Sequence, residues 1–280
     1  MTNFEIRNVD TYRSEYGRLA QALGVRNPSP AAGEVEFLSE VTTPGGFPFG
    51  MLPAPDLFFA GAVTSILSPR LAIEIGTASG FSAAVLAKVI ALRWQESGVL
   101  PAGTFVHTID FKAQFCQNLT QPIGFAIDLV APELRQHIAV HPLRDSSYCN
   151  QLIQAGGLTF AFVDGNHQHP WPLTDVLQIQ CLMKIGWILM HDIDLPAHIR
   201  KAQASGQRVV PPPRFGAKHV FDFWPGEKIK AGNIGAIKLP ENRSSLGELV
   251  AKLRELPREV SGGSWTKRWR DIDALTKEVP

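Results

Sequence analysis

The sequence predicts an α/β protein whose core is a mostly parallel sheet with helices on both faces. Three observations predict this fold. Short apolar runs alternate with helical segments, several of these runs end at an acidic residue, and the stretch Leu71–Lys88 combines a buried strand, a glycine-rich turn and the start of a helix. Such a succession builds βαβ units, in which parallel strands bring their carboxyl ends to one edge of the sheet.

The composition is that of a globular protein with a sizeable core. Of the 280 residues, 45% are hydrophobic and 19% are charged, and the net charge is +1. This balance provides no basic field to attract nucleic acid, so we expect no nucleic-acid partner. The three cysteines, Cys116, Cys149 and Cys181, form no C-x-x-C pair. Their spacing argues against a disulfide framework or a zinc ribbon and is typical of a reducing, cytoplasmic setting.

The sequence indicates neither a membrane span nor an export signal. The best apolar run, Leu57–Leu67, has about half the length that a membrane-spanning helix needs. The N-terminal residues lack the basic and apolar regions of a signal peptide. We therefore expect no membrane partner.

Three segments are expected along the chain. Residues 1–54 form an N-terminal helical cap and a lid loop, residues 55–256 form the main domain, and residues 257–280 form a tail with a short amphipathic helix. Residues 43–50 contain too many glycines and prolines for regular structure, and the loop around Phe47–Met51 forms either a lid or substrate wall or a plain surface loop. A helix over Pro55–Leu67 leads into the first strand.

The glycine-rich turn Gly76–Gly80 is the first candidate binding element. It follows a strand that ends at Ile75 and precedes a helix over Ser82–Leu92. A helix N-terminus after a glycine turn suits an anionic or nucleotide-like ligand, because backbone amides point toward it. The spacing is G-x-x-x-G rather than the G-x-G-x-x-G of a dinucleotide site, so the turn alone leaves the ligand open.

Asp110 is the second candidate. It ends a β-rich segment, Thr104–Ile109, about thirty residues after the turn, and the Ser97–Gly103 loop accounts for the long spacing. A carboxylate at this strand end accepts both hydroxyl protons of a ribose diol. The alternative is an aspartate that only caps the end of the strand. A third strand, His137–His141, leads to the polar turn Arg144–Ser147.

Two further strands deliver acidic residues to the same edge. Phe160–Val163 is followed by Asp164, and Trp187–Met190 is followed by His191 and Asp192. Carboxylates brought together repel one another unless a cation lies between them, and oxygen ligands favour a hard divalent ion. The alternative is that Asp164 contacts only the cofactor and Asp192 only caps a turn.

The segment E-I-G-T-A-S-G-F-S resembles motif I of class I S-adenosylmethionine (SAM) methyltransferases. It is most similar to the catechol/caffeoyl-type and sugar O-methyltransferase branches, which share E-x-G-x-x-x-G-[FY]-S, and the resemblance covers roughly residues 45–240. It implies a Rossmann-like sheet of seven strands with an antiparallel last strand. It also implies a set of cofactor-binding residues: Glu74, Gly76, Thr77, Ser79, Gly80, Ser82, Asp110, Asp145, Ser146 and Asp164.

The resemblance further implies roles at the acidic edge. Asp164 and Asp192 match aspartates that hold a divalent metal, Mg²⁺ or Mn²⁺, in these families. His191 departs from the usual pair and either ligates the metal, which would favour Mn²⁺, Fe²⁺ or Zn²⁺, or supports the ligands. His167 falls at the position where these families keep their general base, and an imidazole suits the removal of a proton from a hydroxyl group. His169 is its competitor, and a zinc site from the three histidines is an alternative. Asp145 and Ser146 would lie beside the adenine, although Ser146 also suits a helix N-cap.

The C-terminal part is expected to complete the sheet and then dock. His219–Trp224 and Ile234–Leu239 are predicted as the last two strands, followed by a helix over Ser244–Leu256. The tail helix, Ser264–Lys277, carries Trp265 and Trp269 on one face. It packs either on its own domain or on a homodimer partner, and an RNA-binding patch at residues 267–270 is a weaker alternative.

Together these features predict a SAM-dependent methyltransferase that acts on a hydroxyl oxygen of a small molecule, with a divalent metal and His167 as general base. Two other classes stay open: an NAD-type oxidoreductase, and a protein that binds SAM or a nucleotide without turnover. The sequence does not identify the methyl acceptor.

Overall fold

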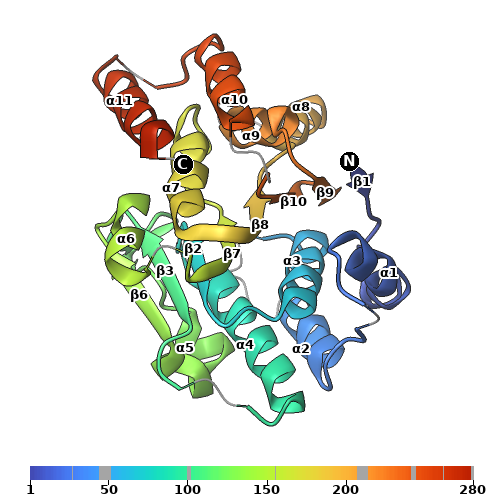
Figure 1. Cartoon of the computed structure of the whole chain (residues 1–280). Helices are drawn as coiled ribbons and strands as arrows, with labels where there is room; N and C mark the ends of the chain where they lie inside the picture. Colours follow the sequence, from blue (N-terminus) through green and yellow to red (C-terminus); the bar gives the residue numbers. More distant parts are fainter. Residues whose placement is uncertain are drawn as a thin grey trace.

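The protein is built around one eight-stranded sheet with helices on both faces (Figure 1). The computed structural model describes residues 1–26, 28–43, 52–99, 102–154, 156–206, 214–240, 244–260 and 262–278. The strand order is β1-β9-β10-β8-β7-β2-β3-β6. The strands are β1 (Thr2–Asn3), β2 (Ala72–Ile75), β3 (Val106–Asp110), β6 (Ile138–Pro142), β7 (Leu158–Val163), β8 (Met183–His191), β9 (Lys228–Ala231) and β10 (Ile234–Lys238).

The pairing confirms the predicted fold class. β6, β3, β2, β7 and β8 pair in parallel, and β10 lies antiparallel between β8 and β9. The sheet exceeds the predicted seven strands because β1 adds a short parallel strand beside β9. A separate hairpin, β4 (Gln114–Phe115) with β5 (Asn118–Pro122), follows β3 and was not predicted.

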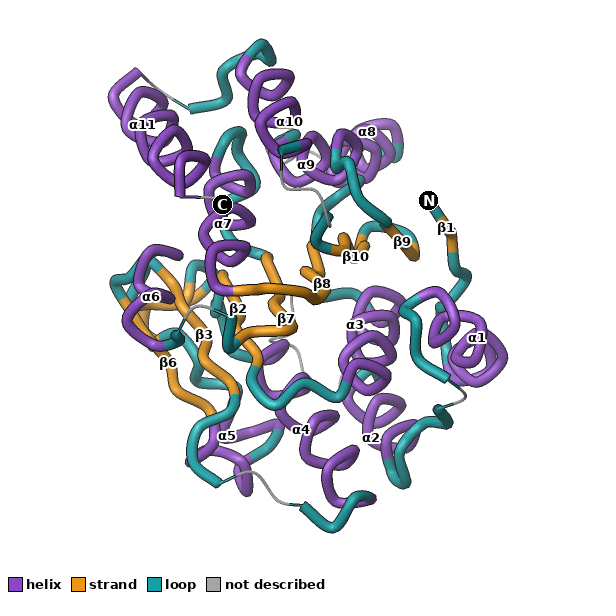
Figure 2. The backbone as a smooth tube through the Cα atoms, viewed as in Figure 1, coloured by secondary structure: helices purple, strands orange, loops and turns teal. Residues whose placement is uncertain are grey.

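Alternating side chains explain why both faces are covered. In β7, Phe160 and Phe162 belong to one core cluster, whereas Ala161 and Val163 belong to the other. This alternation is the period-two pattern of a strand buried on both faces. Figure 2 shows α1–α5 on one side of the sheet and α7, α9, α10 and α11 on the other. Their bounds are α1 (Val9–Ala22), α2 (Glu34–Val41), α3 (Ala54–Leu67), α4 (Phe81–Glu96), α5 (Ile127–Val130), α6 (Cys149–Leu152), α7 (Trp171–Leu182), α8 (Leu195–Ala204), α9 (Gly216–Phe223), α10 (Ser245–Arg254) and α11 (Gly262–Glu278).

The predicted strand His219–Trp224 is wrong, because most of this segment belongs to α9. Its aromatic residues favour a strand by propensity, but the buried positions recur at helical spacing, at Ala217, Val220 and Phe221. An ion pair of 2.8 Å between Lys218 and Asp222, one turn apart, lies on the outer face. The antiparallel pair that completes the sheet is instead β9 and β10.

The C-terminal helix packs on its own domain. Trp265, Trp269 and Ile272 are buried in the same core cluster as α7, and α11 lies beside α7 in both views (Figures 1 and 2). Arg268 and Trp269 are buried, so two of the four residues of the RNA-binding patch expected at 267–270 are not available to bind RNA. The expected lid around residues 47–51 and the segment 207–213 lie outside the described residues. No helix in the described ranges combines the length and apolarity needed to cross a membrane.

A buried polar network fixes the N-terminal helices to the domain. Glu34 on α2 is fully buried and accepts hydrogen bonds from the Tyr12 hydroxyl, from Ser65 Oγ at 2.6 Å and from the Ala31 amide at 2.7 Å. Arg93 on α4 donates to Ser65 Oγ and lies 3.9 Å from the Glu34 carboxylate. A buried carboxylate is tolerated when its oxygens are paired in this way.

We expect Glu34→Ala to lower the free energy of unfolding by about 3 kcal/mol, because several buried donors lose a charged acceptor. Urea unfolding followed by circular dichroism measures this change. Glu36→Ala on the same helix is the matched control, since its side chain is 72% exposed, and it should change stability by less than about 0.5 kcal/mol. Equal effects of the two substitutions would contradict the proposed anchoring.

Candidate functional site

The turn after β2 approaches neighbouring backbone so closely that it requires glycine. Gly76 has φ +105°, and a Cβ there would lie 2.2 Å from the carbonyl oxygen of Asp164. Gly80 has φ +83°, and its Cβ would lie 2.6 Å from Cα of Gly124. Both positions therefore exclude side chains by conformation and by space. The close approach seats the turn against the end of β7.

Glu74 supports the turn from behind. Its side chain is fully buried and accepts a hydrogen bond from Thr108 Oγ1, whose oxygen lies 2.7 Å from that of Thr77. Burial raises the pKa of the Glu74 carboxyl to about 8. The group is therefore mainly neutral at pH 7, which allows it to remain in the core without a cation.

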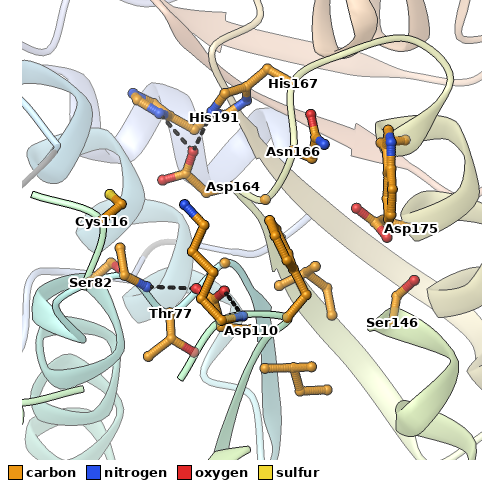
Figure 3. A pocket seen from close by; sticks show the side chains of 18 of the residues that line it. Thr77, Ser82, Asp110, Cys116, Ser146, Asp164, Asn166, His167, Asp175 and His191 are labelled. Carbon is orange, nitrogen blue, oxygen red and sulfur yellow. Dashed lines mark hydrogen bonds and ion pairs between the residues drawn. The ribbon is translucent and has the colours of Figure 1, made fainter. Parts of the chain in front are cut away.

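A cavity of about 460 Å³ opens at the carboxyl ends of the parallel strands. Figure 3 shows Asp164, His167 and His191 together at the top, Thr77 and Asp110 below them, and Ser146 and Asp175 on the right. Most predicted site residues line this cavity: Gly76, Thr77, Ser79, Ser82, Asp110, Asp145, Ser146, Asp164, His167, His191 and Asp192. Glu74 and Gly80 lie outside the lining and shape it from behind.

Asp110 lies at the end of β3 and faces the turn. Its carboxylate accepts the backbone amide of Ala78 at 3.1 Å and that of Lys112 at 2.9 Å. Phe111, the next residue, stacks with Trp171 at 6.4 Å between ring centroids, and both rings line the cavity. The middle of the cavity thus combines a carboxylate with an aromatic wall.

Asp145 and Ser146 lie on the same side as this wall. Asp145 accepts the Ser147 amide at 3.1 Å, so it caps the short helix there, a role that the sequence suggested for Ser146. Both residues also line the cavity, and Ser146 is only 1% exposed. Asp145 can therefore cap the short helix and still line the cavity, as Ser146 does.

Asp164, His167 and Asp192 form the one group of three potential metal ligands found among the described residues, with ligand atoms within 4.8 Å of one another. His167 Nε2 lies 3.1 Å from Asp192 Oδ2 and 3.9 Å from Asp164 Oδ1. The donor set of two carboxylates and an imidazole suits a divalent cation.

His191 does not belong to this group, although it was predicted as a metal ligand. Its Nδ1 lies 3.0 Å from Asp164 Oδ1 and its Nε2 lies 3.1 Å from Asp56 Oδ2. Burial works against protonation, but the charge and hydrogen bond of Asp164, together with Asp56, hold the pKa of His191 well above its usual value. Both ring nitrogens therefore act as donors to carboxylates.

Two residues that hold the acidic edge were not predicted. Asp56, on α3, is 2% exposed; the available signal was a single aspartate in an apolar helix, which needs a buried partner. Asn233, in the β9–β10 turn, donates to Asp192 Oδ1 at 2.6 Å and accepts the Asp194 amide at 2.8 Å. These bonds fix Asp192 at a left-handed φ of 59°.

The zinc alternative is not supported by the geometry. His169 is fully buried and its Nε2 lies 2.8 Å from the Leu253 carbonyl oxygen. Its ring packs edge-on against Trp265 and Trp269, away from the cavity lining. His169 therefore belongs to the packing of the C-terminal helices.

One part of the chain matches a known protein family. Residues 73–193 match the family model described as a methyltransferase domain. No curated protein matches the chain. A cofactor-bound structure of Rv0187 from MTB is 15% identical, covers 78% of this chain and 100% of its own, and has a TM-score of 0.49. An O-methyltransferase from Bacillus cereus in complex with SAH is 16% identical, and the match covers 82% of this chain and 99% of that one, with a TM-score of 0.45. The O-methyltransferase TomG from Streptomyces achromogenes, in complex with SAM, is 16% identical, and the match covers 82% of this chain and 98% of that one, with a TM-score of 0.46.

The neutral Glu74 carboxyl predicts a pH-dependent stability. Because burial raises the pKa of this carboxyl from its ordinary value of 4.5 to about 8, the folded protein keeps a proton that the unfolded chain releases. The free energy of unfolding should therefore fall by on the order of 4 kcal/mol as pH rises from about 5 to about 8, because the folded state loses the advantage of its bound proton. Glu74→Gln should abolish most of this dependence in denaturant unfolding at pH 5, 6.5 and 8. The exposed Glu227→Gln is the control, and an unchanged pH dependence in Glu74→Gln would contradict the assignment.

Proposed function

We propose that the chain is a class I SAM-dependent methyltransferase and that it transfers a methyl group from SAM to a hydroxyl oxygen of a small molecule, since residues 73–193 match a methyltransferase domain. One observation carries this proposal. Asp164, His167 and Asp192 meet at one end of a cavity that the glycine turn also lines, and Gly76 of this turn packs against the backbone of Asp164. A proton acceptor and a candidate cation site therefore lie beside the place where the methyl group would be presented.

The cavity fits SAM by size and by chemistry. A volume of about 460 Å³ lies in the range of small-molecule sites, about 300–1,000 Å³. The helix N-terminus after Gly80 suits the carboxylate end of the methionine part. Asp110 would bind the ribose hydroxyls, and Phe111 and Trp171 would form the apolar wall of the adenine site. The amino-acid end then lies toward α4, with the adenine on the Ser146 side.

The acidic edge also fits a divalent metal. Asp164 and Asp192 would hold it, and His167, the third member of the group, would act on the acceptor rather than as a ligand. His191 would act as a support, because its bonds to Asp56 and Asp164 orient the carboxylates and reduce their repulsion. A bound divalent cation would lower the pKa of an acceptor hydroxyl.

His167 is the proposed general base. One ring nitrogen, Nε2, lies 3.1 Å from Asp192 Oδ2, so it would donate there and leave Nδ1 to accept a proton. The acceptor oxygen would lose its proton to His167 and form the bond to the methyl carbon, while the electron pair of the breaking bond stays on sulfur. Holding both substrates in line supplies much of the rate gain in such a reaction. From the two segments expected to shape the acceptor pocket, 44–53 and 208–216, the described residues Leu52 and Arg214 line the cavity.

His167→Asn should lower kcat about 10²–10⁴-fold while the Kd for SAM changes less than about threefold, because the base acts on the acceptor rather than on the cofactor. The measurement is transfer of labelled methyl from SAM to a panel of small hydroxyl compounds, catechols and sugars included. His198→Asn, an exposed histidine on α8, should leave kcat unchanged. A His167→Asn enzyme with normal turnover would show that another group takes the proton.

Metal binding is testable without an acceptor. Electron paramagnetic resonance of Mn²⁺ should show one tight site, and Asp192→Asn should weaken it at least about tenfold by removing a charged ligand. The control is Asp128→Asn, which alters an exposed carboxylate that pairs with Arg135 on the surface. If Asp192→Asn and the parent protein bind Mn²⁺ equally, the metal part of the proposal is wrong and methyl transfer is left to His167 alone.

A further inference from the structure

The C-terminal helix α11 brings one buried charge against the domain. Arg268 is 7% exposed and lies on the face of α11 that also buries Trp265, Trp269 and Ile272. A guanidinium is costly to remove from water unless carboxylates and aromatic faces surround it. The position of Arg268 therefore requires partners in the domain beneath.

Two of the three partners of Arg268 line the cavity. The guanidinium carbon lies 3.6 Å from the ring centroid of Trp171, and Nη2 lies 3.3 Å from Asp145 Oδ2. A further partner, Asp271 at 3.5 Å from Nη1, is on α11 itself. Trp171 and Asp145 both line the cavity, whereas Arg268 does not. Arg268 thus reaches the cavity wall from behind.

These contacts restrict both side chains. Asp145 accepts the Ser147 amide and hydroxyl through Oδ1 and Arg268 through Oδ2, so both carboxylate oxygens are engaged. Trp171 begins α7 and stacks with Phe111 in the cavity, and a planar guanidinium on the indole limits rotation of the ring. Burial raises the pKa of the neighbouring Asp175 to about 6 even though Arg268 lowers it. The positive charge of Arg268 thus stabilises the negative charges of the Asp145 and Asp175 carboxylates.

We propose that Arg268 is a positioning residue of the SAM site: it holds Trp171 and Asp145 in the orientation that receives the adenine end, and it makes α11 a part of that site. This inference rests on the proposed function, since it assigns the adenine to this wall. Arg268 touches neither the Asp164–His167–Asp192 group nor the glycine turn. Its loss should therefore weaken binding of the adenine end without affecting the chemical step.

Arg268→Met tests the proposal by removing the charge and the planar group while keeping an apolar stem. Calorimetric titration should show at least about tenfold weaker binding of SAM, and the same fold loss for 5′-methylthioadenosine, which lacks the amino-acid end. The KM for SAM should rise while kcat stays within about twofold. Arg254→Met is the matched control, because Arg254 also stacks on a tryptophan, Trp269 at 4.6 Å, and pairs with Asp273, and neither partner lines the cavity.

The outcomes separate this inference from the proposed function. If the parent protein binds no SAM, the proposed function fails and this inference with it. If the parent binds SAM and a folded Arg268→Met binds equally well, only the positioning by Arg268 is wrong. Arg268→Lys keeps the buried charge and serves if the methionine variant does not fold. A lysine ammonium cannot stack as a plane on the indole, so this variant should bind about threefold or more weakly, and unchanged affinity would again contradict the proposal.

Discussion

The site depends on a balance among three carboxylates and one buried histidine. Asp56, Asp164 and Asp192 come from α3, from the end of β7 and from the end of β8, and His191 lies among them. Carboxylates at this separation repel one another in a partly buried setting. Burial alone would favour neutral imidazole, but the neighbouring charges hold the pKa of His191 high, so the ring donates from both nitrogens. Parallel pairing of β7 and β8 brings the two strand ends together, and His191 then bridges Asp164 and Asp56 at this edge.

The helical additions contribute to the site from behind the cavity wall. On one face of the sheet, α3 supplies Asp56 to the acidic edge, and α2 is fixed to α3 and α4 through Glu34. On the other face, α11 supplies Arg268 to the aromatic wall. The N-terminal and C-terminal segments therefore share the two cores of the central domain, and each supports one end of the cavity. Neither end is built from the parallel strands alone.

Much of the fold and the edge of the site could be predicted from the sequence. Strand ends are marked by local signals, namely an apolar run followed by an acid or a glycine turn, which placed Asp110, Asp164 and Asp192 correctly at one edge. Asp56 and Arg268 were not predicted as site residues, because their partners are distant in the chain. The apolar helix around Asp56 indicates burial but does not identify His191 as its partner. The segment His219–Trp224 was misread for a related reason: its aromatic residues favour a strand, and only packing against β8 and α7 reveals the helical face.

The most direct measurement is calorimetric titration of the purified protein with SAM and with NAD⁺, each with and without Mn²⁺. We predict micromolar binding of SAM that is lost on Asp110→Ala, because the ribose hydroxyls lose their acceptor, and no binding of NAD⁺. Binding of NAD⁺ in the absence of any binding of SAM or its demethylated product would contradict the assignment of the glycine turn and of the cavity behind it.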